Sequence, residues 1–159
     1  MLKKLLNSLK SITSLPKKEA SVKPPEPIFL KFKSDRIAKE FKELPSKNKE
    51  LYEMIVDLSH FVKNSFNKEL VITMIYRTQS EQDDIYKNDP KYKLRKFISP
   101  HQLWHSADLR SLTFDKLEIS KIEDYLNNKY NSMNAYKWTA KCHQVPGQAI
   151  HFHTQMVKK

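Results

Sequence analysis

The sequence predicts an α+β fold in which a small antiparallel sheet is flanked by helices. The chain has 159 residues, a length typical of one domain with a single core. Apolar residues make up 39% of the chain and aromatic residues 11%, which suffices for a packed core. Strand-like and helix-like segments follow one another without the regular strand–helix–strand repeat of α/β proteins. This irregular mixture favours the α+β class.

Three segments carry helical patterns. Residues 46–66 begin at Ser46 and place apolar side chains at helical spacing, which predicts a long helix. Residues 80–87 begin at Ser80 and predict a short helix. Residues 114–130 again have apolar side chains at helical spacing and predict a second amphipathic helix.

The expected strands are short and lie between these helices or after them. Residues 70–76 are rich in β-branched side chains and predict a buried strand. Residues 105–110 predict a short strand, and residues 135–142 and 149–157 predict two closing strands. The polar, proline-containing residues 88–100 are expected to form a loop.

The first 27 residues are expected to lie outside the folded domain, which we place at residues 28–159. Residues 1–15 have leucines at helical spacing between lysines, which predicts an amphipathic segment. That segment is a loose tail, a peripheral membrane contact or a partner-binding element. Residues 16–27 contain four prolines and predict an extended linker. No apolar run is long enough for a transmembrane helix, and polar residues interrupt any signal-peptide core.

The chain is strongly basic and has a single cysteine. Its formal net charge is +11, and such a surface attracts nucleic acid, anionic lipid or acidic wall polymers, unless it serves solubility alone. No recognition-helix or RNA-binding signature is present. Cys142 is the only cysteine, which excludes an internal disulfide and a cysteine-based zinc finger.

Most histidines are concentrated in the C-terminal part of the chain. Five of the six follow residue 100. They are His101, His105, His143, His151 and His153. A strand over residues 149–157 would project His151 and His153 to the same side of a sheet. Such a pair is typical of a metal site, but it also occurs on solvated strand faces.

A carboxylate and an arginine complete the candidate constellation. Asp108 follows His101 by seven residues in an apolar stretch, where a carboxylate is costly unless it is paired or bound to a cation. Two imidazoles and one carboxylate leave the fourth position of a zinc ion open, as in catalytic zinc sites. Arg77 follows the predicted strand 70–76. It either holds a substrate carboxylate or oxyanion or is an ordinary surface residue.

Three motifs occur in order: Tyr76-Arg77-Thr78, Ser99-x-His101 followed by Asp108, and His151-x-His153. Over roughly residues 46–157 the chain resembles the zinc peptidoglycan peptidases of the Hedgehog/D-Ala-D-Ala peptidase fold. That group includes D,D-carboxypeptidases, phage endolysins and the zinc domain of hedgehog proteins. The resemblance implies a Zn²⁺ ion bound by His101, Asp108 and His153, with Arg77 and His151 as catalytic residues.

The chain departs from the family in two ways: in the pattern Ser-x-His-x-x-Gly-x-Ala-x-Asp itself, and in the position of the general-base carboxylate. Trp104 stands where Gly is usual and Ser106 where Ala is usual, so we expect Trp104 to reshape the substrate cleft. Many members carry a general-base Glu or Asp three residues before the third ligand. That position is Ile150 if His153 is the ligand, and Gln148 if it is His151. Either His151 is the base, or the protein binds zinc without cutting. His143 is a further histidine that can enter the site.

The resemblance implies zinc-dependent hydrolysis of peptide bonds in bacterial peptidoglycan, of carboxypeptidase or endolysin type. The alternatives are a non-catalytic zinc-binding module of the same fold and a basic nucleic-acid-binding protein. The expected partner of the hydrolase is the peptidoglycan peptide, with no specific nucleic acid, and the protein is expected to be a monomer. We expect a phage or prophage product, made in the bacterial cytoplasm without a signal peptide and acting at the cell wall.

Overall fold

The computed structural model of the protein describes residues 29–145 and 148–158. The predicted amphipathic segment 1–15 and the linker 16–27 lie outside these residues. The strands of the described part are β1 (Leu30–Phe32), β2 (Leu70–Met74), β3 (Ser106–Arg110), β4 (Ala140–His143) and β5 (His151–Gln155). The helices are α1 (Asp35–Lys47), α2 (Lys49–Phe66), α3 (Gln79–Tyr86), α4 (Pro90–Leu94) and α5 (Lys116–Tyr130), with 3₁₀ turns η1 (Pro100–Leu103) and η2 (Asn131–Met133).

The described strands form one five-stranded sheet in the order β1-β2-β3-β5-β4. The pairs β2–β3, β3–β5 and β4–β5 are antiparallel, whereas β1 and β2 are parallel. The α+β class is therefore confirmed, and the sheet is antiparallel except at its β1 edge. β1 was not predicted, because three residues are too few to show a period of two.

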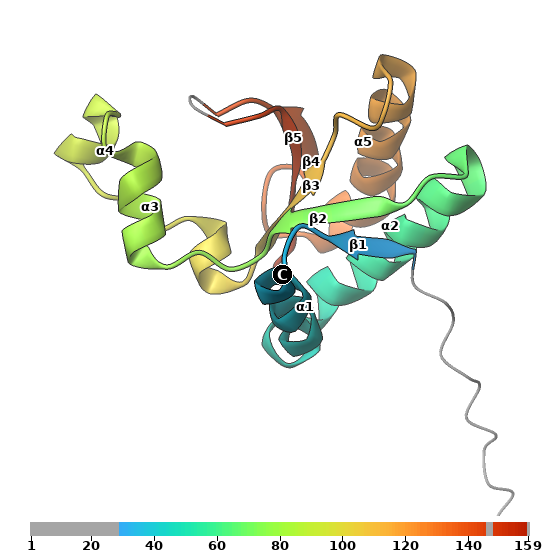
Figure 1. Ribbon diagram of the computed structural model, residues 1–159, viewed down its shortest axis with the longest axis horizontal. Coiled ribbons are helices and arrows are strands. Elements are labelled where there is room, and N and C mark those ends of the chain that lie inside the picture. The colour runs from blue at the N-terminus through green and yellow to red at the C-terminus, as the bar shows by residue number, and fades with distance from the viewer. Residues whose placement is uncertain (1–28, 146–147, 159) are drawn as a thin grey trace, which may run out of the picture.

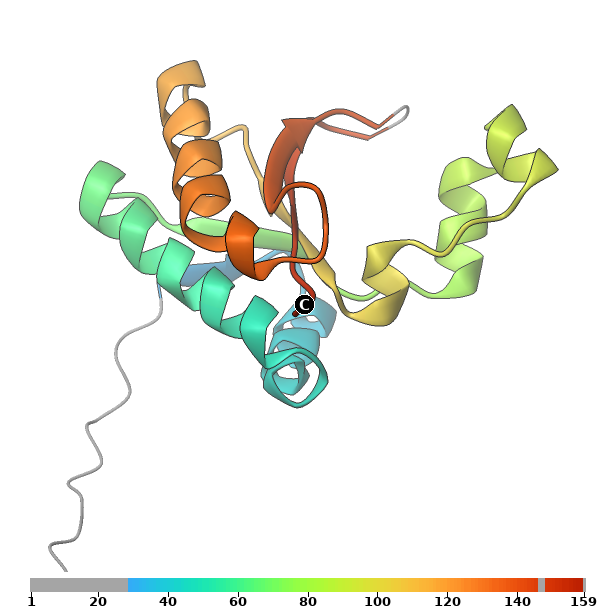
Figure 2. The ribbon, with the colours of Figure 1, turned by 180° about the vertical axis from the view of Figure 1, so that it is seen from behind.

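One face of the sheet is covered by helices and carries the core. Ile72, Leu109 and Phe152 are aligned across β2, β3 and β5 and are fully buried. They pack with apolar side chains of α2 and α5, which lie side by side behind the sheet (Figures 1 and 2). Because side chains alternate along a strand, Asp108 and His153 point to the opposite face. That face carries the candidate site.

The helix α1 was missed in the sequence, and the start of the long helix was placed too early. Ser46 lies in the last turn of α1 rather than at a helix start. The side chain of Asn48 caps α2 instead, because its Oδ1 accepts from the backbone N–H of Leu51 at 3.0 Å. α1 begins after the N-cap Ser34 and has Pro45 in its interior, a residue that normally argues against a helix.

The predicted loop 88–100 is wrong at its centre, because α4 occupies part of it. Asp89 caps this helix and Pro90 stands in its first turn, where a missing N–H costs nothing. α3 was predicted correctly but begins after Thr78, whose side chain forms a capping box with Glu81. Together with η1, these short helices lie apart from the α2–α5 layer (Figure 1).

The last two predicted strands are confirmed as β4 and β5, but both are shorter than expected. In the predicted strand 135–142 only the last three residues belong to β4, because residues 135–139 bend before it. The strand predicted at 149–157 is regular over His151–Gln155. Among the described residues, no helix is both long and apolar enough to cross a membrane.

Candidate metal centre

Three side chains from separate elements meet on the open face of the sheet. Asp108 on β3 stands directly opposite His153 on β5, and His101 comes from η1. Asp108 Oδ1 lies 2.9 Å from His153 Nδ1 and 3.1 Å from His101 Nε2. The three candidate ligand atoms all lie within 4.8 Å of one another. These residues, predicted as a metal site, are therefore brought together and could hold a metal ion.

His101 is fixed in orientation by its neighbours. Its ring is 1% exposed, and its Nδ1 lies 2.9 Å from the carbonyl oxygen of Ile75. Since a carbonyl can only accept a hydrogen bond, Nδ1 carries the proton and donates it. Nε2 of His101 then faces Asp108 Oδ1. A backbone carbonyl holding the outer nitrogen is the usual support for a metal-binding histidine.

His151 is held in the same tautomer but stands farther from the carboxylate. Its Nδ1 donates to the carbonyl of Ala149 at 2.8 Å, and its Nε2 lies 3.7 Å from Asp108 Oδ1. His153 is closer to that oxygen, so the geometry favours His153 as the third member of the group and leaves His151 beside it.

The charges of the site suit a cation. Burial alone would raise the pKa of Asp108, but His101 and His153 outweigh burial and hold that pKa well below its ordinary value. Burial lowers the pKa of His153, although its hydrogen bond to Asp108 opposes this. The carboxylate and the two imidazoles place their candidate ligand atoms within 4.8 Å of one another, close enough to share a cation. The donor set of two imidazoles and one carboxylate therefore fits a divalent metal ion.

Arg77 belongs to this site and is not a surface residue. Its side chain is 5% exposed, and its guanidinium lies 3.9 Å from Asp108 Oδ2. Nη1 donates to Gln82 Oε1 at 3.0 Å. Among the described residues, Arg77 Nε and Gln82 Nε2 are buried without a hydrogen-bond partner. Gln82 on α3 was missed, because a glutamine in an amphipathic helix has no distinguishing sequence pattern.

His143 and Trp138 complete the surroundings of the histidine pair. The ring centroid of His143 lies 5.0 Å from that of His151 and 5.8 Å from that of His153. Burial, together with the two neighbouring histidines, lowers the pKa of His143. Trp138 packs edge-on against His153 at 5.7 Å. His105 lies elsewhere, with its Nδ1 3.1 Å from the hydroxyl of Tyr136.

Trp104 does not reshape the cleft as expected. It adopts a left-handed backbone conformation, with φ 60° and ψ 27°, a conformation that favours glycine. Its ring stacks on Tyr76 with centroids 4.9 Å apart. Trp104 is absent from the residues that line the cavities around the metal centre. Ser106 is fully buried, also outside these cavities, and its Oγ has no partner among the described residues.

The site opens into a cavity of about 190 Å³. Arg77, His143 and Gln148 line it together with the three candidate ligands and His151. Among its described lining residues, Asp108 is the only one with a carboxylate. The two positions expected for a general-base carboxylate are Gln148, which lines this cavity, and Ile150, which does not. Neither side chain is a carboxylate.

The described residues thus form an α+β protein with a His–Asp–His group that could hold a metal ion. Comparison with protein-family models, with curated proteins and with solved structures gave no match. Function therefore has to be argued from the site itself.

Proposed function

We propose that this protein is a zinc-dependent peptidase that hydrolyses peptide bonds in bacterial peptidoglycan. The observation that carries the proposal is the convergence of His101, Asp108 and His153 on one point, with Arg77 against the same carboxylate. Three protein ligands of this kind are typical of a catalytic zinc site with one open position. Zinc in such a site supplies a Lewis acid that acidifies water and polarises a carbonyl.

Arg77 supplies a fixed positive charge beside the candidate metal ligands. Gln82 accepts a hydrogen bond from its Nη1, and burial prevents the guanidinium from moving into solvent. A preoriented cation stabilises an oxyanion, or positions a substrate carboxylate, without reorganisation during the reaction. The order of the motif residues along the chain, which resembles that of zinc peptidoglycan peptidases, supports this role.

His151 is the residue best placed to move a proton. Its Nδ1–H is held by the carbonyl of Ala149, so Nε2 is the nitrogen free to accept a proton at the site. His143 packs against its ring and limits access of water. Because Asp108 is the only carboxylate among the described lining residues of the central cavity and is engaged with two histidines, His151 takes the role of the general base.

The same absence of a second carboxylate favours one alternative, a zinc-binding module that does not cut. Such a module would keep His101, Asp108 and His153 for binding or assembly. The two functions differ in what His151 does: the hydrolase needs its Nε2 for proton transfer, whereas a module needs neither the proton nor the ring. A variant that removes His151 and keeps the metal ligands separates them.

The first test measures zinc on the purified full chain by mass spectrometry and by competition with a chelator. We expect one zinc per chain. His101→Ala and His153→Ala should each lower the zinc affinity by at least about 100-fold, since loss of a supporting residue already costs 10- to 100-fold. His105→Ala is the matched control, because its ring lies outside the site. A chain that binds no zinc at micromolar concentration overturns the proposal.

The second test incubates zinc-loaded protein with purified peptidoglycan and follows released peptides and new amino groups. The hydrolase releases both, and His151→Ala should lower the rate by about 100-fold or more while zinc remains bound. Bound zinc without any released peptide would instead support the non-catalytic module.

A further inference from the structure

The central cavity adjoins two larger cavities. One, of about 660 Å³, shares Arg77, Asp108 and His151 with the central cavity. The other, of about 690 Å³, shares Tyr86 and Val145 with it. Gln148 lines all three. Shared lining residues make both larger cavities neighbours of the central one at the candidate metal centre, and we call the three together the groove.

The first extension, which we call the basic arm, lies over β1, β2 and β3. Lys33, at the end of β1, and Arg110, at the end of β3, line it together with Arg77. Its only carboxylate among the described residues is Asp108, which is engaged with the histidines. Lys33 and Arg110 are exposed. Within residues 29–145 and 148–158 neither forms an ion pair, whereas the nearby Lys31 pairs with Glu69 at 2.5 Å. The basic arm therefore has two cations free to bind an anionic group.

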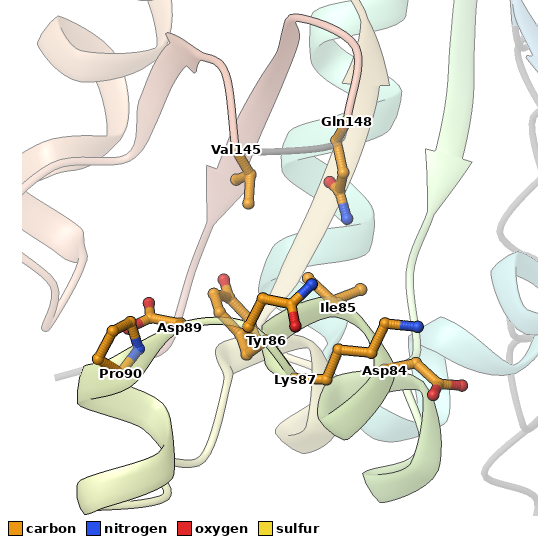
Figure 3. A pocket seen from close by; sticks show the side chains of 9 residues that line it. Asp84, Ile85, Tyr86, Lys87, Asp89, Pro90, Val145 and Gln148 are labelled. Atoms are coloured by element: carbon orange, nitrogen blue, oxygen red, sulfur yellow. The ribbon is translucent and has the colours of Figure 1, made fainter.

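The second extension, the α3 arm, is different in character. Figure 3 shows Val145 and Gln148 of the β4–β5 connection facing Ile85 and Tyr86 of α3 across this cavity. Asp84 and Asp89 line it together with Lys87, so opposite charges are both present. This arm offers apolar and aromatic surface without a strong preference for either sign of charge.

We infer that the groove binds a peptide that crosses the metal centre, with a carboxylate of the peptide in the basic arm and an uncharged flank in the α3 arm. Lys33 and Arg110 are then specificity-determining residues for that carboxylate. Each arm has the volume of a cavity for a drug-sized ligand, which is room for a peptide segment rather than for one atom group. The inference rests on the proposed function for its placement across a scissile bond, but carboxylate binding does not depend on cleavage.

The carboxylate can belong to an acidic side chain or to the C-terminus of the peptide. Three pentapeptides of alanine, each labelled at the N-terminus with an uncharged fluorescent dye, distinguish these sources. The first has Glu at the centre and an amidated C-terminus, the second has Gln and a free C-terminus, and the third has Gln and an amidated C-terminus. Fluorescence anisotropy gives the dissociation constant of each peptide with the full chain, with chelator and with zinc.

We expect at least one carboxylate peptide to bind about tenfold more tightly than the uncharged one, as a charge-assisted hydrogen bond would produce. Preference for the first peptide identifies a side chain, and preference for the second identifies the C-terminus. The double variant Lys33→Glu, Arg110→Glu should abolish the preference. The matched control is the double variant Lys116→Glu, Lys121→Glu, which changes the net charge by the same amount on α5, behind the sheet. This control should keep the carboxylate preference.

Equal binding of all three peptides by the unchanged chain overturns the inference, as does a preference that survives in the Lys33 and Arg110 variant. The zinc affinity of this variant should stay within about twofold of the unchanged chain. If the protein binds zinc and cuts peptidoglycan but shows no carboxylate preference, only the present inference is contradicted. If the protein prefers carboxylate peptides but binds no zinc, only the proposed peptidase function is contradicted.

Discussion

His101 and His151 show how single hydrogen bonds set the chemistry of the site. Each ring gives its Nδ1–H to a backbone carbonyl, of Ile75 and of Ala149 respectively. The remaining nitrogen of each ring, Nε2, therefore faces Asp108. The contrast lies in distance, because only the His101 nitrogen is within hydrogen-bonding range of the carboxylate. Two chemically identical side chains thus stand at different distances from Asp108 through their position alone.

Trp104 combines an unfavourable backbone with a favourable ring contact. A left-handed conformation costs a non-glycine residue about 1–2 kcal/mol, and an aromatic stack such as that with Tyr76 contributes about 0.5–1.5 kcal/mol beyond burial. The ring also lies near Lys47, with Nζ 5.8 Å from its centroid. The two effects are similar in size, which explains how a large residue is kept where glycine fits the backbone better.

A pair of variants separates these effects. Trp104→Ala loses the ring and keeps the strained backbone, whereas Trp104→Gly loses the ring and relieves the strain. Both should be less stable than the unchanged chain, but Trp104→Ala should unfold about 1 kcal/mol more easily than Trp104→Gly. Urea unfolding followed by circular dichroism gives both free energies. Equal stability of the two variants would show that residue 104 is not under backbone strain.

At the scale of elements, α3 and α4 are joined mainly by polar and aromatic contacts. Asp83 on α3 accepts hydrogen bonds from the hydroxyl of Tyr92 at 2.5 Å and from Lys96 at 2.9 Å. Tyr86 and Tyr92 pack against Phe97. Nearby apolar side chains are little buried, and Leu94 is 90% exposed. This pair of helices forms a wall of the α3 arm and depends on the charge of one carboxylate.

The contact between α3 and α4 should depend on the charge of Asp83 over a defined pH range. Tyr92 and Lys96 lower the pKa of Asp83 from 3.8 to about 2. A carboxylate with a depressed pKa stabilises the folded state above its unfolded pKa, and this contribution is lost as the pH falls through the folded value. Amide hydrogen exchange of α4 should therefore quicken between pH 4 and pH 2 relative to that of α2, after correction for intrinsic rates.

The control for this prediction is Asp83→Asn. An asparagine cannot change its charge, so the variant should show fast exchange in α4 already at pH 5 and little further change on acidification. An unchanged pH response in Asp83→Asn would assign the effect to other carboxylates.

At the scale of the whole molecule, Asn48 connects three distant parts of the chain. Its side chain caps α2, and its Nδ2 donates to the carbonyl of Met156 at 2.7 Å and to that of Trp104 at 3.2 Å. It therefore joins the α1–α2 junction to the end of η1 and to the residue after β5. Because η1 and β5 carry His101 and His153, this buried amide helps to hold the two halves of the metal centre in register.

Removal of this amide should destabilise the whole domain. Asn48→Ala loses a helix cap, which is worth about 1 kcal/mol, and leaves buried carbonyls unpaired at about 1–3 kcal/mol, so we expect a loss of about 3 kcal/mol. Ser34→Ala removes the exposed cap of α1 and should cost about 1 kcal/mol or less. Urea unfolding measures both. A similar cost for the two variants would show that the long-range bonds of Asn48 contribute nothing.

Local patterns predicted the elements that have a long or regular period and failed on the others. α2, α5 and the strands around the site were found because their apolar side chains repeat over enough residues. α1 was missed although Ile37, Phe41 and Leu44 are buried at helical spacing, because the stretch is otherwise polar and contains a proline. α4 was missed because five residues hold too little pattern. His101, Asp108 and His153 were predicted as a metal site from the order of their motifs, and the structure brings these side chains together.

The sequence by itself determined which face of each strand carries Asp108, His151 and His153, because alternation along a strand is a local property. Only the tertiary structure decided that Asp108 stands opposite His153 and that Arg77, Gln82 and His143 surround them, because strand register and helix placement depend on partners far away in the chain. The basic arm was hidden for the same reason: Lys33 and Arg110 are 77 positions apart in the numbering and become neighbours of one cavity only when β1, β2 and β3 pair.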